Sequence, residues 1–309
     1  MSRPRVFIFA NPIAGRGRGA DIARRLHARL GAEGYDVEVV LDPPLEFDAA
    51  RLAGSTPVSA AIVIGGDGTL RAVAHRLFLD REEASGGPAA VAPPLLIVPL
   101  GTANLMGRHL GIRWRPATLT DQVALALARR RVVRLDTARV NGHLFLLVAG
   151  VGFDAHVVYE LNRLRRGPIQ VASYLAPTLL ALRGYGFPPL AVTVDGQAVF
   201  GPEPGVAFIG NLPEYGTGFP ILPYARADDG VLDVCVLPCR SRGDLVRLFL
   251  KAAVGEHLRT EGAVYVKGRH ARIESPSGTP IPIQVDGDPA GHTPADIDLL
   301  PIRLPFIVP

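Results

Sequence analysis

Three apolar runs in the first third of the chain each end in a loop of glycine and small polar residues. The runs are Val6–Ala10, Ala61–Ile64 and Leu95–Val98. Residues at helical spacing follow the first two loops, so the order strand, loop, helix repeats. Buried strands joined by helices form a parallel sheet that is covered on both faces. The sequence therefore predicts a parallel α/β domain with all three loops at the carboxyl edge of its sheet.

The pattern changes near Arg134. Asn141-Gly142 separates the strand-like runs Arg134–Val140 and His143–Val148, which is a strong signal for a type I′ hairpin, and Asp195-Gly196 gives a second hairpin that continues into Gln197–Phe200. Short strands then continue to the C-terminus. We therefore predict an α/β domain over residues 1–134 and an antiparallel β-sandwich with a few helices over residues 135–309. The last strand, Ile297–Val308, is free to return to the first domain.

The remaining elements follow from hydrophobic period and from turn residues. The first domain adds a strand over Asp36–Leu41 and helices around Ile22–Leu30, over Thr69–Leu79 and over Asp121–Arg130. Predicted helices of the second domain are Ala155–Arg165, Ser173–Arg183 and Asp244–Ala253, and its later strands are Val206–Gly210, Val231–Leu237, Ala263–Val266, Ala271–Ser275 and Ile281–Val285. The stretch Glu82–Pro94 is rich in Ala, Gly and Pro and is predicted to be a mobile loop.

Composition excludes several classes of protein. Hydrophobic residues make up 48% of the 309 residues, which is ordinary for a globular chain and too high for a disordered one. The net charge is +4, which is too small to indicate a nucleic-acid partner. No apolar stretch approaches the ~20 residues of a membrane helix. The two cysteines suit neither a zinc site nor a disulfide framework, so we expect a cytoplasmic protein.

The loop Gly65-Gly66-Asp67-Gly68-Thr69 carries the clearest chemical signal. Glycines let the backbone approach a phosphate closely, and the helix after the loop points its N-terminus at an anion. The Asp67 carboxylate would repel that phosphate unless Mg²⁺ lies between them. A plain Asp-Gly hairpin is the alternative, but the helical spacing after Thr69 argues against it. We predict a nucleotide phosphate site in this loop.

Two more loops follow strands in the same way, Asn11-Pro12-Ile13-Ala14-Gly15 and Pro99-Leu100-Gly101-Thr102-Ala103-Asn104. Neither belongs to the common nucleotide motifs. The chain has no Gly-x-x-x-x-Gly-Lys-Ser/Thr loop, and its glycine spacing is not that of a dinucleotide-binding domain. Three loops that converge at one crevice make a stronger case for a site than any one loop.

In this order, the three loops resemble the catalytic domain of the diacylglycerol kinase family, which also contains sphingosine and ceramide kinases and bacterial lipid kinases. The resemblance continues at Gly152-Phe153-Asp154-Ala155, at Asp229-Gly230-Val231-Leu232 and at Val285-Asp286-Gly287-Asp288, and it covers nearly the whole chain. It implies an ATP-binding α/β domain, a β-sandwich that takes the lipid, and an active site between the two.

The resemblance also implies the activity. This would be an ATP- and Mg²⁺-dependent lipid kinase of phospholipid biosynthesis, acting on diacylglycerol or a related lipid and touching the membrane surface transiently. The resemblance is also compatible with a homodimer. The nucleotide-binding residues it implies are Asn11, Pro12, Gly15, Gly65, Gly66, Asp67, Gly68, Thr69, Gly101, Thr102 and Asn104.

A second cation is implied at the acidic turn before the strand Val231–Leu237. The resemblance assigns the carboxylate of Asp229 and the backbone carbonyls of Arg226 and Val231 to this ion. Such an oxygen shell suits Mg²⁺. A plain Asp-Gly turn is the alternative, and turn chemistry weighs the two about equally.

The catalytic carboxylates implied are Asp67 and a pair near the C-terminus, Asp286 and Asp288, with Asp288 standing where the family has a Glu. In a strand-like segment, side chains two residues apart point the same way. We therefore predict that Asp286 and Asp288 lie together, and that one of them accepts the proton of the lipid hydroxyl. The alternative is another Asp-Gly hairpin turn, like the one at Asp195.

Two departures from the family pattern keep other functions open. Arg71-Ala72 stand where the family has Asn-Glu, and Leu105 stands where an Asp is common. The lost carboxylate favours a non-catalytic nucleotide- or lipid-binding protein of the same fold. An NAD kinase is a further alternative because it shares the Gly-Gly-Asp-Gly loop, although the downstream motifs fit lipid kinases better.

Overall fold

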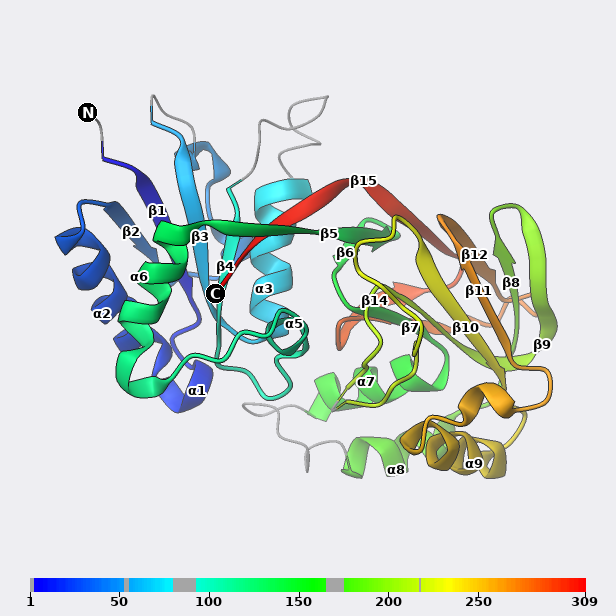
Figure 1. Ribbon diagram of the computed structural model, residues 1–309. Coiled ribbons are helices and arrows are strands. Elements are labelled where there is room, and N and C mark those ends of the chain that lie inside the picture. Colours follow the sequence, from blue (N-terminus) through cyan, green and yellow to red (C-terminus); the bar gives the residue numbers. More distant parts are fainter. Residues whose placement is uncertain (1–2, 53–55, 80–92, 165–174, 217) are drawn as a thin grey trace. The chain divides into compact units, whose positions relative to one another are not determined.

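The computed structural model describes residues 3–52, 56–79, 93–164, 175–216 and 218–309. The chain divides into two compact units, the first of residues 1–135 with 303–309 and the second of residues 136–302. The last strand, drawn red in Figure 1, contributes to both units. Most of the predicted loop at Glu82–Pro94 lies outside the described residues.

The first unit is a parallel sheet in the strand order β2-β1-β3-β4, and the end of β15 adds beside β4 (Figure 1). Its strands are β1 (Arg5–Ala10), β2 (Asp36–Val40), β3 (Val58–Gly65), β4 (Leu95–Pro99) and the start of β5 (Arg131–Val140). Its helices are α1 (Ala14–Gly17), α2 (Gly19–Ala32), α3 (Asp67–Ala74), α5 (Leu105–His109) and α6 (Leu119–Arg129). A π-helical turn over His75–Leu79 extends α3.

Successive side chains of β1 point to opposite faces of the sheet, and each face has its own buried layer. Val6, Ile8 and Ala10 belong to one buried cluster with the apolar faces of α2 and α6. Phe7 and Phe9 point to the other face, where both rings contact Phe47 at centroid distances of 5.5 and 5.0 Å. A strand with both faces covered needs apolar residues throughout, which explains the continuous apolar runs of the sequence.

The second unit is a β-sandwich. Its strands are the end of β5, β6 (His143–Phe145), β7 (Val148–Val151), β8 (Pro189–Val194), β9 (Gln197–Gly210), β10 (Leu232–Pro238), β11 (Val264–Gly268), β12 (His270–Glu274), β13 (Pro282–Val285), β14 (Asp288–His292) and β15 (Ala295–Val308). Its helices are α7 (Phe153–Leu164), α8 (Leu175–Gly184) and α9 (Arg242–Ala253).

The long strand β9 joins the two layers of the sandwich. Its first half pairs with β8, which continues through β12 to β15, and its second half pairs with β7 and β10. Strands β13 and β14 extend the second layer beyond β7. A buried cluster that includes Phe145, Ile209, Val234 and Ile283 fills the space between the layers.

The predicted fold class, a parallel α/β domain followed by an antiparallel sandwich, is confirmed. Both Asn-Gly and Asp-Gly hairpins are also confirmed, with positive φ at both turn residues in each case. Three details were wrong. The predicted strand His143–Val148 is two strands, β6 and β7, and the strands predicted on either side of Gly201 are one strand, β9. Helical spacing predicts that Phe249 shares one face of its helix with Leu245, Leu248 and Ala252, but Phe249 is 60% exposed whereas those three are buried.

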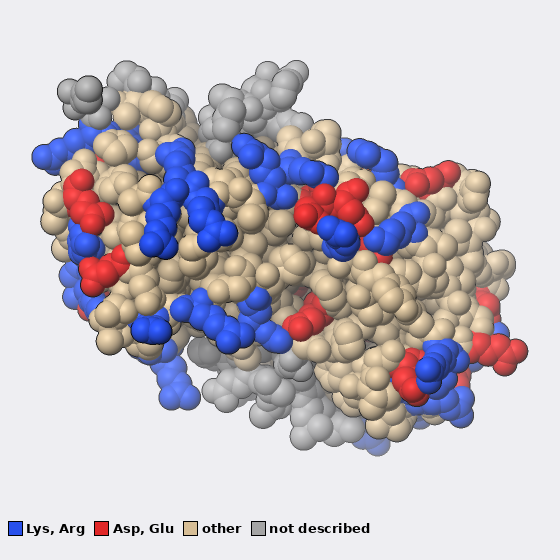
Figure 2. Space-filling model, in the orientation of Figure 1, with Lys and Arg blue, Asp and Glu red and all other residues tan. Residues whose placement is uncertain are grey.

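Basic side chains on the face in Figure 2 stand in small groups with neutral surface between them. Within the described ranges, no helix combines the length and the apolar character that crossing a membrane requires.

Candidate functional site

The three glycine-containing loops meet at the carboxyl ends of β1, β3 and β4. The backbone N–H of Asn11, directly after β1, donates to the carbonyl of Ile64 near the end of β3 at 3.0 Å. The N–H of Leu100, after β4, donates to the carbonyl of Gly65 at 2.8 Å. The predicted convergence of the loops is therefore present, and every contact that produces it lies within the first unit.

Glycine is required where the second and third loops touch. A Cβ on Gly101 would lie 2.5 Å from the Cα of Gly66, and a Cβ on Gly66 would lie 3.0 Å from the Cα of Gly101. Backbone atoms cannot move aside as the end of a flexible side chain can. The two glycines therefore let the loops pack backbone to backbone at the sheet edge.

Asp67 links the second loop to the third. Its carboxylate accepts the backbone N–H groups of Leu105 at 3.0 Å and Met106 at 3.2 Å, the first two residues of α5. Burial raises the pKa of Asp67, and these two donors hold back part of the rise. A carboxylate has about four lone-pair positions, so two N–H donors leave capacity for a cation. The carboxylate therefore fits both the cap of α5 and the predicted Mg²⁺ contact.

Asn104 holds the third loop in shape. Its side-chain Oδ1 accepts the N–H of Gly101 at 2.7 Å, and its Nδ2 donates to the carbonyl of the same residue at 2.8 Å. Its own backbone is left-handed, with φ of 50°, which Asn tolerates better than most residues. Both polar atoms of the side chain are used inside the loop, whereas Thr102 is exposed beside it. Asn104 is thus placed to shape the loop, and a contact of Thr102 with a ligand stays a prediction.

The first loop is a tight turn over Asn11 to Gly19. The Asn11 side chain accepts the N–H of Ile13 at 3.1 Å, and Gly15 and Arg16 have φ of 60° and 62°. A Cβ on Gly19 would lie 2.0 Å from the carbonyl oxygen of Asn11. The start of α2 therefore lies directly against the end of β1. Pro12 is exposed, whereas a Cβ on Gly15 would meet the Leu100 side chain at 3.4 Å.

In the second unit, Asp286 and Asp288 do not lie on one strand. Strand β13 ends at Val285 and β14 begins at Asp288, with Asp286 and Gly287 forming the turn at φ of 50° and 88°. The expectation that the two carboxylates point the same way from a strand was therefore wrong, because the Asp-Gly pair makes the hairpin that we considered as the alternative.

The Asp286 carboxylate is used as a backbone anchor. It accepts the N–H groups of Leu146, Leu147 and Val148 at 2.8, 2.9 and 3.1 Å, in the connection between β6 and β7. The other Asp-Gly hairpin repeats the device, since the Asp195 carboxylate accepts the N–H groups of Arg269 and His270. Asp288 is the half-buried first residue of β14. Which of the two carboxylates accepts a proton stays a prediction.

A lysine lies at the acidic turn where we predicted a cation. The Nζ of Lys267 donates to Asp229 Oδ2 at 2.8 Å and lies 3.4 Å from Asp233 Oδ2. The other oxygen of Asp229 accepts the N–H of Val231 at 3.4 Å, and the Arg226 side chain faces Asp228. No group of three or more metal-ligating side chains occurs in the part of the chain that the structure describes. The side chains therefore give Asp229 an ammonium group as its partner and do not form a metal site. A metal bound by Asp229 and by the carbonyls of Arg226 and Val231 stays a prediction.

Sequence reasoning missed Asp136, which holds the same turn from the other side. Asp136 is 5% exposed, and its Oδ2 accepts the N–H of Gly230 at 2.7 Å. Its own N–H donates to the carbonyl of Ala227 at 2.6 Å. The sequence offered only an Asp in a strand that also contains Arg134, Thr137 and Arg139, and its partner lies 94 residues away.

Asp154 is a buried carboxyl group of the second unit. It is the second residue of α7 and does not cap that helix, although capping is the more frequent role for such a residue. Its Oδ1 accepts the hydroxyl of Tyr215 at 2.7 Å, and a Cβ on Gly150 would lie within 2.7 Å of both its Oδ2 and the Gln284 amide nitrogen. Burial raises the pKa of Asp154 to about 6, against the smaller opposite effect of hydrogen bonds from Tyr215 and Gln284.

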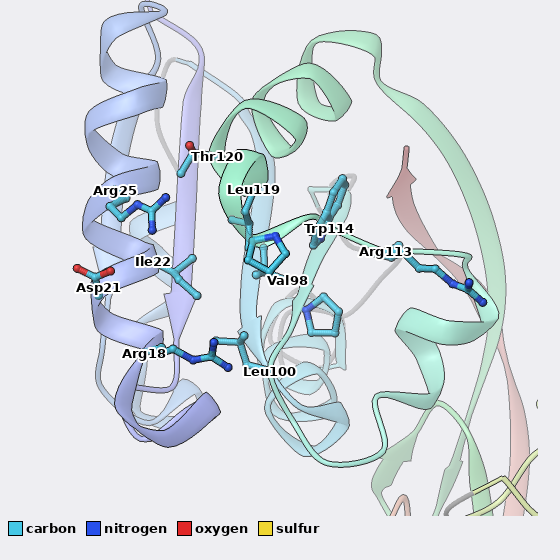
Figure 3. Close-up of a pocket in the computed structure, with 13 residues that line it drawn as sticks. Arg18, Asp21, Ile22, Arg25, Val98, Leu100, Arg113, Trp114, Leu119 and Thr120 are labelled. Carbon is cyan, nitrogen blue, oxygen red and sulfur yellow. The ribbon is translucent and has the colours of Figure 1, made fainter.

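A pocket of about 360 Å³ lies beside the third loop, between α2 and the segment that leads to α6. Figure 3 shows Arg18 and Arg25 on one side of it and Trp114 on the other. Pro99 and Leu100 connect it to the loop, but none of the predicted nucleotide-binding residues lines it. The pocket is therefore a separate feature of the first unit.

Comparison with known proteins agrees with this arrangement. The family model described as "Diacylglycerol kinase catalytic domain" matches residues 5–140, and the model described as "YegS C-terminal NAD kinase beta sandwich-like domain" matches residues 147–308. This chain belongs to the diacylglycerol kinase family. A diacylglycerol kinase of Mycobacterium tuberculosis is 29% identical to it over 99% of this chain and 95% of that protein.

Other members of the diacylglycerol kinase family are similar over most of their length. A Pseudomonas aeruginosa protein named "Probable lipid kinase YegS-like" is 31% identical over 87% of this chain and 80% of its own. The crystal structure of a diacylglycerol kinase from Bacillus anthracis superposes with a TM-score of 0.66 at 23% identity, covering 99% of this chain and 97% of that one. The fold is thus that of solved family members, and the relatives carry the names of lipid kinases.

Proposed function

We propose that this protein transfers the γ-phosphate of ATP to the hydroxyl group of a lipid, with diacylglycerol or a related lipid as the acceptor. The observation that carries the proposal is the meeting of three glycine-containing loops at one sheet edge in a member of the diacylglycerol kinase family. Phosphoryl transfer needs little covalent chemistry from the protein and depends on positioning and on neutralising charge. Loops that present backbone N–H groups supply the positioning.

In this proposal each loop has its own task. Backbone N–H groups of the second loop, from Gly66 to Gly68, hold the phosphates, and Gly101, whose own N–H is taken by Asn104, lets the third loop pack closely against them. Thr69 and Thr102 offer hydroxyl groups to the same ligand, and Asn11 and Asn104 keep the outer loops in shape. Bound with the nucleotide, Mg²⁺ would neutralise phosphate charge, and Asp67 is the carboxylate that fits it.

The acceptor side of the reaction needs a base. We assign this role to Asp288, which stands at the start of β14 beside the turn that Asp286 anchors. A carboxylate there would accept the proton of the lipid hydroxyl as that oxygen attacks the phosphorus. The lipid would be reached at a membrane surface from the cytoplasm.

The test uses Asp67→Asn with purified protein, labelled ATP and a panel of diacylglycerol, ceramide and sphingosine. The variant keeps one oxygen to accept an N–H from α5, so the fold should survive while turnover falls about 10²-fold or more. Asp21→Asn, a surface carboxylate on α2 that pairs with Arg24, is the control and should keep full turnover. If Asp67→Asn turned over at the wild-type rate, Asp67 would not belong to the phosphate site.

The same panel separates the proposal from its main competitor. Ala72 stands where the family has a Glu, which favours a protein that binds nucleotide without using it. If the wild-type protein binds ATP and phosphorylates no lipid of the panel, the non-catalytic alternative replaces our proposal. Phosphorylation of NAD by the wild-type protein would favour the NAD kinase alternative.

A further inference from the structure

Helix α9 exposes a row of large apolar side chains. Val246, Phe249, Leu250 and Val254 are 54, 60, 62 and 70% exposed. We call these four residues the α9 apolar stripe. They recur at i, i+3, i+4 and i+8, which is the spacing of one helix face, and they extend for about 12 Å along the helix. Single exposed apolar residues are ordinary, but a continuous row on one element marks a surface that another apolar phase covers.

The helix that carries the stripe is firmly attached to the second unit. Leu245, Leu248 and Ala252 form its buried face. Ser241 caps its N-terminus by accepting the N–H of Asp244 at 3.2 Å. The stripe is therefore a fixed feature of the surface, and the ring of Phe249 is supported from below by Phe219 at a centroid distance of 5.2 Å.

The charges of α9 indicate what covers the stripe. Arg242, Arg247 and Lys251 belong to the helix, and Asp244 in its first turn is the only acidic residue from 242 to 255. Arg247 and Lys251, four residues apart, lie next to the stripe on the helix surface. Among the described residues, Arg247 is engaged by Asp244 in a surface pair at 3.3 Å, which water and salt weaken. Arg242 is exposed and donates to the carbonyl of Arg183 at 2.9 Å, and Lys251 is half-buried and donates to the Thr260 hydroxyl at 3.3 Å. Apolar side chains beside basic ones are the pattern of helices that lie in the interface of an anionic membrane.

We propose that the α9 apolar stripe docks the second unit onto a lipid bilayer that contains anionic headgroups. The stripe enters the boundary between headgroups and acyl chains, while Arg242, Arg247 and Lys251 contact phosphate or carboxylate groups of the headgroups. The inference rests on the proposed function in one respect, since a kinase for a membrane-dissolved lipid has to meet its substrate at a bilayer. The choice of α9 rests on the exposure and charge of its own residues.

The test measures co-sedimentation of the full-length protein with vesicles, in the absence of ATP. The vesicles contain phosphatidylcholine alone or equal parts of phosphatidylcholine and phosphatidylserine. The wild-type protein should bind the mixed vesicles more tightly. The double variant Phe249→Glu, Leu250→Glu should lose about tenfold or more in affinity, because two apolar side chains become charged at the point of insertion. The double variant Arg247→Gln, Lys251→Gln should lose affinity only for the mixed vesicles.

A matched control is Leu125→Glu on α6 of the first unit, where Leu125 is 49% exposed. It introduces a charge at an exposed leucine away from the stripe and should bind vesicles as the wild type does. The unfolding midpoint of each variant is measured alongside, because Phe249 packs against Phe219 and Lys251 is half-buried, and vesicle binding is compared between samples that are folded at the assay temperature. Equal vesicle binding by the wild type and by Phe249→Glu, Leu250→Glu would overturn the proposal.

Two more outcomes distinguish bilayer docking from dimerisation and from a catalytic role of the stripe. If the wild type is a dimer in sedimentation velocity and Phe249→Glu, Leu250→Glu is a monomer, a second copy covers the stripe and the proposal is wrong. With short-chain diacylglycerol dissolved as monomers, the stripe variant should phosphorylate at the wild-type rate. If the wild-type protein binds vesicles through the stripe but has no kinase activity, the docking surface stands and the proposed function is wrong.

Discussion

At the scale of single residues, the structure separates carboxylates that look alike in the sequence. Asp286 and Asp288 both flank the same glycine, yet Asp286 anchors three backbone N–H groups and Asp288 begins a strand. Asp67 caps a helix that begins 38 residues later in the chain. These carboxylates therefore differ in their structural environment, although each stands next to a glycine in the sequence.

This difference predicts opposite effects of two substitutions. Asp288→Asn should lose turnover by about 10²–10⁴-fold with a nearly unchanged unfolding midpoint, because it removes the proposed base. Asp286→Asn should instead lower the free energy of unfolding by about 1–3 kcal/mol, since at least one backbone N–H loses its charged acceptor. Its turnover per folded molecule should stay near that of the wild type. Turnover and urea unfolding measured on the same preparations test both statements.

The hairpin at Asp195 provides the control. Asp195→Asn removes the same kind of anchor, with two backbone N–H groups, from a turn that carries no family motif. It should destabilise the protein by a similar amount and leave turnover unchanged. A contrary outcome would be an active Asp288→Asn together with an Asp286→Asn whose turnover falls by more than its fraction of folded protein. In that case Asp286 would be the base.

At the scale of elements, the site depends on how closely loops can pack. Strands β3 and β4 are parallel neighbours, so the loops after them leave the sheet side by side. They touch through Gly66 and Gly101, and the Asn104 side chain closes the third loop on itself. Any side chain at the contact would separate the two loops and move their N–H groups.

Gly101→Ala should therefore disturb the site strongly, although the substitution adds only one methyl group. The added Cβ would lie 2.5 Å from a backbone atom of Gly66, so the loops must move apart. We expect a loss of about 1–3 kcal/mol in the free energy of unfolding, as for other overpacked positions, and weaker ATP binding. Urea unfolding and calorimetric ATP titration measure the two effects.

Gly31→Ala is the matched control, because a Cβ there meets nothing within 4 Å and Gly31 lies in helix α2. It should stabilise the protein by about 0.5–1 kcal/mol, the usual gain for alanine over glycine in a helix. If Gly101→Ala is as stable as Gly31→Ala and binds ATP normally, the backbone contact between the loops is not required.

At the scale of the whole molecule, buried carboxyl groups make stability depend on pH. The pKa of Asp154 is raised to about 6 from an ordinary value of 3.8, because burial disfavours its charged form. Between these two values the folded protein holds a proton that the unfolded chain releases. The free energy of unfolding therefore falls as the pH rises through this window, by about 3 kcal/mol in total for a shift of this size.

Asp154→Asn should remove that dependence. The amide keeps an oxygen for the Tyr215 hydroxyl and has no charge to bury. We expect the variant to be more stable than the wild type by about 1–3 kcal/mol at pH 7.5 and by less at pH 4.5. Urea unfolding at the two pH values checks this, with Asp21→Asn as an exposed control. Equal pH profiles for the wild type and Asp154→Asn would contradict the assignment.

Much of the fold could be predicted from the sequence, because it depends on local pattern. Continuous apolar runs predicted the parallel sheet, since strands covered on both faces need apolar residues at every position. Asn-Gly and Asp-Gly pairs predicted the hairpins, because few other residues adopt positive φ twice in succession. Glycines and a short polar set at three strand ends likewise predicted which loops meet, since parallel strands end at one edge.

What the sequence could not determine is how each polar side chain is used. Leu146 is 140 residues from Asp286, Gly230 is 94 from Asp136, and Asp229 is 38 from Lys267, so no local pattern connects them. Hydrophobic period sets which elements form, but only the packed structure decides which N–H group or cation reaches a given carboxylate. A carboxylate gains its role from those partners and from its burial, and both arise when distant segments come together.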